Sequence, residues 1–151
     1  MAWFFSSPRP AFSDGKIDLF PLRVSQPARE LGFGREMTWR ITEHGSRREI
    51  GRITYRPGES PAVYFFGHIG YHIDPPWRGH HYAARACRLI AEFIRRSGKS
   101  SVVITTDPDN QASRKTCLAL GCLWESEVPV DPALQKKYDI SPRKERYIWR
   151  V

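Results

Sequence analysis

The segment 62–106 constrains the fold more than any other part of the chain, because its hydrophobic pattern changes twice. Residues 62–73 are rich in aromatic and β-branched side chains, which predicts a strand. Residues 82–96 then carry apolar side chains at helical spacing, and a glycine follows where a helix C-terminal cap belongs. Residues 101–106 form a second β-branched run. A strand, a helix and a strand of this length predict a right-handed crossover between two parallel strands.

The remaining segments predict antiparallel strands around this crossover and one more helix. Alternating apolar residues on both sides of a histidine-glycine-serine turn predict a hairpin within 37–55. A strand is expected over 16–24, with Pro21 either at a sheet edge or interrupting the strand. A helix capped by Asp109 or Asn110 is expected to end at Gly121. Closing strands are expected at 122–128 and 145–151, joined by a long loop. We therefore expect an α+β fold of three layers, in which helices flank a mixed central sheet that is largely antiparallel with one parallel pair.

Chain length and charge limit the choices further. With 151 residues and 40% hydrophobic content, the chain can build one packed core, so we expect a single domain over 1–151 with an irregular N-terminal arm at 1–15. Three cysteines, Cys87, Cys117 and Cys122, lie at no zinc-like spacing, which predicts reduced thiols and a cytoplasmic location. No run is long enough to span a bilayer. The net charge of +8 favours anionic partners, either nucleic acid or a polyanionic cofactor.

The turn that leads into the helix at 82–96 is suited to binding phosphate. It follows the preceding strand through two prolines and carries small residues, Gly79, Ala83 and Ala84, that let a ligand approach the backbone. Backbone N–H groups in the first turn of a helix lack partners within the helix, and with the helix dipole they attract a diphosphate. Because ligands collect beyond the carboxyl ends of parallel strands, the expected site lies at residues 72–84.

Two motifs in this region resemble those of a known family. The run from Gly70 to Ala83 resembles the acetyl-CoA signature of GNAT N-acetyltransferases, Q/R-x-x-G-x-G/A after a strand and a proline. Arg78 matches the first position and Ala83 the last, whereas His81 stands where glycine is usual. The second motif is Asn110-Gln111-Ala112-Ser113 leading to Leu120-Gly121, which is similar to the family's N-x-x-S/A … L-G-F run with Cys122 in place of the aromatic residue. The resemblance covers roughly residues 37–127.

The resemblance implies an N-acetyltransferase that uses acetyl-CoA as co-substrate and needs no metal. By analogy with the family, backbone groups of Tyr71, His72 and Ile73 would pair with the pantetheine arm and polarise the acetyl carbonyl. Asn110 and Ser113 would contact the pantetheine amide, although Asn110 is also explained as a helix cap alone. The pyrophosphate would be held by the N–H groups of Gly79, His80, His81, Tyr82, Ala83 and Ala84, with Arg78 beside them.

His81 leaves two alternatives open. If its position requires a positive φ, a bulky residue would obstruct the turn and impair cofactor binding. If instead its side chain points outward, His81 and His80 add partial positive charge near the phosphates. We favour the outward side chain, because the matching residues around His81 are retained.

The catalytic residues are less clearly indicated. Direct attack of an amine on the thioester needs a proton acceptor and a proton donor for the departing thiolate. Many GNAT enzymes place a tyrosine donor seven residues after the asparagine, where this chain has Cys117; the alternative is a buried core cysteine. His68 and His72 share one face of the expected strand and are candidate bases, with His72 favoured because it borders the predicted acetyl group. Packed, noncatalytic histidines are the alternative, and Asp107 and Glu125 are further base candidates.

The acceptor side is expected to be open. Family members usually have two helices between the first strands, and residues 25–35 are too short for both. The N-terminal arm, the loop 131–142 or a second subunit in a homodimer would complete the site, and the acceptor would be a small-molecule amine or a peptide or protein amine. A noncatalytic CoA-binding or sensor domain is the alternative function. A nucleic-acid-binding module is disfavoured, since no base-stacking motif is present. No metal site is expected, because the histidines of this region lack partners at ligand spacing.

Overall fold

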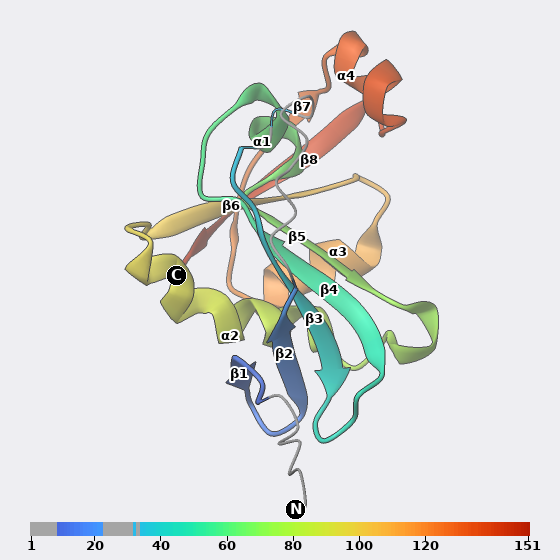
Figure 1. Ribbon diagram of the computed structural model, residues 1–151. Helices are drawn as coiled ribbons and strands as arrows, with labels where there is room; N and C mark the ends of the chain where they lie inside the picture. The colour runs from blue at the N-terminus through green and yellow to red at the C-terminus, as the bar shows by residue number, and fades with distance from the viewer. Residues whose placement is uncertain (1–8, 23–31, 33) are drawn as a thin grey trace, which may run out of the picture.

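One mixed sheet organises the protein. The computed structural model describes residues 9–22, 32 and 34–151, and within them eight strands follow the order β1-β2-β3-β4-β5-β6-β8-β7 (Figure 1). The strands are β1 (Phe12–Ser13), β2 (Ile17–Pro21), β3 (Met37–Glu43), β4 (Glu49–Tyr55), β5 (Ile69–Ile73), β6 (Ser101–Thr106), β7 (Leu123–Pro129) and β8 (Arg143–Arg150). Neighbours are antiparallel except β5 and β6, so the predicted sheet with one parallel pair is confirmed.

Helices flank the sheet on both faces. They are α1 (Pro61–Phe66), α2 (Tyr82–Arg96), α3 (Gln111–Ala119) and α4 (Pro132–Tyr138), with a 3-10 turn, η2 (Pro75–Trp77). Helix α2 packs on the face that carries the main core, whereas α1 lies on the other face, where its Phe65 carbonyl accepts a hydrogen bond from Thr105. Helix α4 adjoins α1, with the rings of Phe66 and Tyr138 5.2 Å apart. No helix of these described ranges is long and apolar enough to cross a membrane.

Helix α2 forms where the sequence predicts it and belongs to the crossover from β5 to β6. Its buried residues recur at helical spacing and face the isoleucines of the sheet. The hydroxyls of Tyr55 and Ser97 lie 2.6 Å apart and join β4 to the end of the helix. Gly98 follows with a φ of 95°, the left-handed conformation expected of a glycine after a helix C-terminus. The C-terminal end of the helix is therefore fixed against the sheet.

Two segments differ from the sequence-based prediction. Residues 62–66 were expected to be strand and belong to α1 instead, because Ser60 accepts a hydrogen bond from the Val63 N–H at 3.1 Å and Pro61 occupies the first helical position. These start signals outweigh the strand propensity of the aromatic residues. The expected loop at 131–142 contains α4 for the same reason: the Asp131 carboxylate accepts from the Ala133 N–H at 2.8 Å.

The N-terminal region bears out the edge position of Pro21. Strand β1 pairs with Asp18 and Leu19 of β2 and ends before Pro21, so within the described residues no neighbour needs the missing N–H of this proline. Of the predicted irregular arm at 1–15, Phe12 and Ser13 are in β1. Residues 1–8 lie outside the described part of the chain, as do most of residues 25–35, on which the expectation of missing acceptor helices rests.

Candidate functional site

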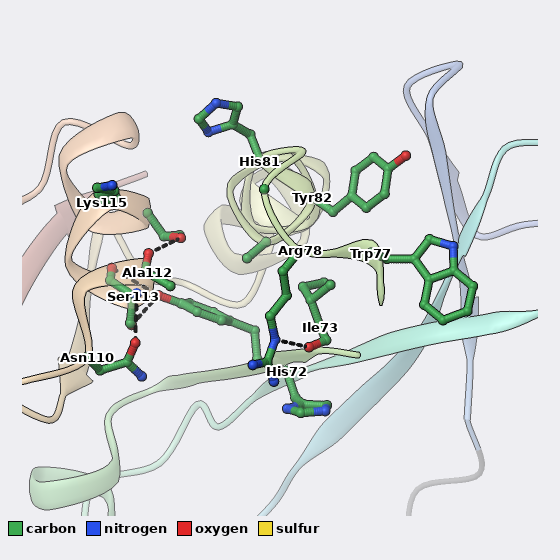
Figure 2. Close-up of a pocket in the computed structure, with 14 residues that line it drawn as sticks. His72, Ile73, Trp77, Arg78, His81, Tyr82, Asn110, Ala112, Ser113 and Lys115 are labelled. Atoms are coloured by element: carbon green, nitrogen blue, oxygen red, sulfur yellow. Dashed lines mark hydrogen bonds between the residues drawn. The ribbon is translucent and has the colours of Figure 1, made fainter. Parts of the chain in front are cut away.

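A cavity opens where the two parallel strands separate. The β5–β6 ladder has one register pair, Ile69 with Ile104, and beyond it a cavity of about 410 Å³ lies between the end of β5, the start of α2 and α3 (Figure 2). Every residue predicted to bind the cofactor lines this cavity except His80 and Ala84. The imidazole of His80 stacks on Tyr82 and Ala84 is buried. Sequence reasoning missed four lining residues, Trp77, Ala112, Lys115 and Thr116.

The hydrogen-bonding direction of β5 decides which backbone groups reach the cavity. Just past the strand, the Asp74 N–H donates to Ile50 O at 2.8 Å, on the β4 side. Because the direction alternates along a strand, the peptide groups of His72 also face β4, whereas those of Tyr71 and Ile73 face the opening beside β6. Of the three backbone positions predicted to contact pantetheine, Tyr71 and Ile73 therefore offer groups to a ligand.

The turn at the start of α2 has a left-handed residue at its centre. His81 has φ 59° and ψ 25°, so its position does require the positive φ that a glycine would adopt freely. Its side chain is nevertheless exposed, and Figure 2 shows the imidazole pointing away from β5. Arg85 N–H donates to His81 O at 3.1 Å as a first helical bond, which leaves the N–H groups of Tyr82, Ala83 and Ala84 without partners inside the helix. The histidine strains the backbone and leaves the turn open.

Contacts from the β3–β4 hairpin fix this turn. The Glu43 carboxylate accepts from Trp77 Nε1 at 3.2 Å and from the Tyr82 hydroxyl at 2.8 Å. The guanidinium of Arg48 lies 4.6 Å from the centre of the Trp77 ring. Hydrogen bonding to Glu43 raises the pKa of Tyr82, because it stabilises the protonated phenol. The turn is therefore held from a strand more than thirty residues away in the sequence.

The lining of the cavity is cationic. It contains Arg78 and Lys115 and no carboxylate among the described residues. The Arg78 Nε–H donates to Ile73 O at 2.7 Å, as the dashed line in Figure 2 shows, so this side chain lies across the mouth between β5 and α2. Together with the dipole of α2, these charges favour an anionic ligand.

Helix α3 supplies a polar wall. The Asn110 side-chain oxygen accepts from the Ser113 N–H at 3.1 Å and caps the helix, which leaves the amide NH₂ available to a ligand. The Tyr71 hydroxyl lies 2.7 Å from Ser113 Oγ. Burial raises the pKa of Tyr71 well above its usual value, so the phenol stays protonated at ordinary pH. The same Tyr71 hydroxyl also lies 3.5 Å from the Ser113 carbonyl oxygen, so Tyr71 and Ser113 are joined by two hydrogen-bond contacts.

The predicted catalytic residues are not brought together. His72 lines the cavity with a side chain 62% exposed, and its Nε2 lies 3.2 Å from Asp74 Oδ1. Cys117 is fully buried beneath the lining, and hydrogen bonding to Cys122 together with burial raises its pKa. His68 lies just before β5 and outside the lining: its Nδ1 accepts from the Val103 N–H at 2.9 Å.

The alternative bases are likewise outside the cavity. The Asp107 carboxylate pairs with Lys144 at 2.6 Å, and the Glu125 carboxylate pairs with Arg146 at 3.3 Å. Among the residues that the structure describes, no three histidine, cysteine, aspartate or glutamate side chains gather as a metal site would require. His72 is the one candidate base whose side chain borders the cavity within the described ranges.

The mixed sheet with one parallel pair and flanking helices matches the fold of solved acetyltransferase structures. Residues 8–123 match the family described as "Acetyltransferase (GNAT) domain", and this chain belongs to that family. No curated protein sequence matched the chain.

Solved structures share the fold at low sequence identity. The microcin C7 self-immunity acetyltransferase MccE, solved with acetyl-CoA and AMP, has a TM-score of 0.59 and 19% identity over 77% of this chain and 61% of that one. The ribosomal-protein-S5-alanine acetyltransferase of Vibrio fischeri has a TM-score of 0.59 and 18% identity over 81% and 63%. A proposed acetyltransferase of T. thermophilus has a TM-score of 0.63 and 17% identity over 96% and 90%. The chain spans less than two thirds of the length of the first two.

Proposed function

We propose that this protein transfers an acetyl group from acetyl-CoA to a primary amine, by direct attack within a ternary complex. The observation that carries the proposal is the cavity at the β5–β6 divergence, which combines free backbone groups, a helix N-terminus and a cationic lining. The structure of MccE, which has the same fold, was solved with acetyl-CoA, and this supports acetyl-CoA as the ligand. The acceptor is a small molecule or a peptide or protein amine, and a cytoplasmic homodimer stays a prediction from the sequence.

The first turn of α2 would hold the pyrophosphate. Three N–H groups of the turn point along the helix axis without partners inside the helix, and Gly79 and His81 adopt the positive φ that curves the backbone around an anion. Arg78 and Lys115 add charge on either side of the opening. Both side chains are exposed, so their attraction for phosphate weakens as salt is added.

The backbone of β5 would hold pantetheine and the acetyl group. Tyr71 offers its peptide groups and Ile73 its N–H at the opening, whereas the Ile73 carbonyl already accepts from Arg78; the Asn110 amide NH₂ lies across the cavity on α3. A backbone N–H near the acetyl oxygen stabilises the oxyanion that forms during attack. Fixed peptide dipoles are effective in this role because they need no rearrangement during the reaction.

The proton balance assigns roles to His72 and to the Tyr71–Ser113 hydroxyl pair. The amine nitrogen attacks the thioester carbon, the C–N bond forms, the C–S bond breaks, and an acetamide and CoA result. His72, with Nε2 toward Asp74, accepts the amine proton through Nδ1, directly or through water. The Tyr71–Ser113 hydroxyl pair lines the cavity and would donate a hydrogen bond to the thiolate sulfur, which takes its proton from water; burial keeps the Tyr71 phenol protonated by raising its pKa.

Thermal unfolding followed by a turnover assay tests the proposal. Acetyl-CoA at about 100 times its Kd should stabilise the protein by about 2.7 kcal/mol. Release of CoA thiol is then measured across a panel of primary amines. Stabilisation together with amine-dependent thiol release supports an acetyltransferase. Stabilisation without thiol release from any amine leaves a noncatalytic CoA-binding domain, and absence of stabilisation removes the proposed site.

A pair of variants at His81 ties the stabilisation to the turn. Asparagine and aspartate both tolerate the left-handed backbone, and they differ only in charge. A carboxylate about 6 Å from a phosphate adds about 0.7–2.8 kcal/mol of repulsion between effective dielectric constants of about 80 and 20. His81→Asp should therefore weaken acetyl-CoA binding between about threefold and a hundredfold relative to His81→Asn. Equal affinity in the two variants would mean that the phosphates bind elsewhere.

A further inference from the structure

A row of aligned residues crosses the face of the sheet opposite α2. Phe20, Arg40, Arg52 and His72 are direct cross-strand partners on β2, β3, β4 and β5. The row ends at the cavity, because His72 is among its lining residues, and Figure 2 shows the imidazole on the side of β5 away from α2. Arg40, Arg52 and His72 therefore lie side by side on three strands, and His72 borders the part of the cavity where the amine would bind.

Arg40 and Arg52 stand directly opposite each other on β3 and β4. The Leu22 N–H donates to Thr38 O, so even-numbered residues of β3 direct their peptide groups to β2. Arg40 and Arg52 therefore form a non-hydrogen-bonded pair, with Cα atoms about 4.5 Å apart, and like charges directly opposite destabilise a sheet. The Arg40 guanidinium lies over the ring of Phe20 at 5.0 Å.

The carboxylates near the row leave Arg40 uncompensated. Glu49 accepts from Arg52 at 2.9 and 3.3 Å, and Asp74 lies 3.2 Å from His72. Arg40 donates to the Arg47 carbonyl at 3.4 Å and has no carboxylate partner in the part of the chain that the structure describes. The Arg52–Glu49 pair is exposed, at 59% and 35%, and such pairs are weak enough for a ligand anion to replace Glu49.

We propose that Arg40 and Arg52 bind an anionic group on the acceptor, which is a small primary amine carrying a carboxylate or phosphate. The inference rests on the proposed transfer to an amine and adds the class of acceptor. A guanidinium matches the planar geometry of a carboxylate and pairs equally well with the oxygens of a phosphate. Neighbouring strands lie about 4.8 Å apart, so the anion binds about 5–10 Å from an amine beside His72. This span fits an ω-amino acid such as 6-aminohexanoate and exceeds the distance between the two groups of glycine.

Binding to the protein–CoA complex, followed by turnover, tests this acceptor class. The probes are 6-aminohexanoate, its neutral amide 6-aminohexanamide, and 4-aminobutyl phosphate, each titrated calorimetrically and then assayed for thiol release from acetyl-CoA. We expect the anionic amines to bind about tenfold more tightly than the neutral amide, the size of one charged hydrogen bond, and the preference to weaken at high salt. The phosphate and carboxylate arms show which anion fits better.

Charge-removing variants assign the preference to the arginines. Arg40→Gln should reduce the ratio of anionic to neutral affinity, with Arg52 supplying what remains, and Arg40→Lys should retain more of it. Arg96→Gln removes an arginine that pairs with Glu92 on α2, on the other face, and should keep the full ratio. Melting curves of all three confirm that they are folded.

The outcomes separate this inference from the proposed function. Equal binding of 6-aminohexanoate and its amide to the wild type, or a preference unchanged in Arg40→Gln, overturns the inference even if the amines are acetylated. An arginine-dependent preference in binding without thiol release keeps the inference for the ligand class and contradicts the proposed chemistry.

Discussion

The left-handed backbone of His81 gives a stability prediction with a definite sign. A non-glycine residue in this conformation costs about 1–2 kcal/mol, and the φ of His81 is 59°. Glycine removes that strain but loses about 0.5–1 kcal/mol through its freer unfolded chain. His81→Gly should therefore raise the free energy of unfolding by about 0–1.5 kcal/mol. For a domain of this size, each kcal/mol raises the Tm by about 2–4 °C. Scanning calorimetry measures the change directly.

Two matched variants identify the source of the gain. His81→Ala keeps a Cβ and therefore keeps the strain, so its Tm should not rise. His80→Gly changes a neighbouring residue whose φ is not positive, and it should lower the Tm. A rise in His81→Ala equal to that in His81→Gly would refute the backbone argument. Acetyl-CoA affinity in His81→Gly should stay within a few-fold, because the side chain is exposed; a large gain would show that the histidine obstructs the site.

Four further variants test the roles of individual side chains. His72→Ala should lower turnover at least about a hundredfold with little change in acetyl-CoA binding, and unchanged turnover at saturating acceptor removes His72 from the mechanism. Tyr71→Phe should lower kcat at least about tenfold; an unchanged kcat would mean that the hydroxyl pair does not reach the sulfur. Cys117→Ala should leave turnover within a few-fold while lowering the Tm, and its inactivity while folded would restore the thiol as the proton donor. Burial lowers the pKa of His68 from 6.5 despite its hydrogen bond to Glu59. As the pH falls below about 6.5, the unfolded chain therefore binds more protons than the folded protein, and the free energy of unfolding decreases. His68→Gln should reduce this loss between about pH 7 and 5 in urea titrations, and an equal loss in both proteins contradicts the assignment.

The crossover and the turn before α2 were predictable because local signals and the global fold agree there. The period of the apolar residues in α2, the small residues before it and the cap at Asn110 each specify one structure. The segment that forms α1 was wrongly predicted to be a strand because its aromatic residues favour one. Its helix signals were present in the sequence, since Ser60 is the N-cap and Pro61 the first helical residue.

Other features of the site depend on contacts that no local pattern contains. Trp77 and Tyr82 share the carboxylate of Glu43, which lies in the hairpin. The Tyr71 hydroxyl meets Ser113 across two elements, 42 residues apart in the sequence. By contrast, the positive φ of His81 had a sequence signal, since glycine is usual at that position of the motif. The register that aligns Arg40 with Arg52 depends on a bulge in the β3–β4 ladder and could not be read from spacing alone.

The β5–β6 ladder has one register pair, so the end of β5 has no strand partner on its β6 side among the described residues. On the proposed function, pantetheine takes the position of a missing strand segment, so the cofactor contributes to the cooperativity of folding as well as to the reaction. The amide hydrogens of Tyr71 and Ile73 should then exchange with solvent much more slowly once acetyl-CoA is bound, whereas that of His72, already directed to β4, should change least. Alternation of protection along three consecutive residues would be the signature of a ligand that binds as a strand does.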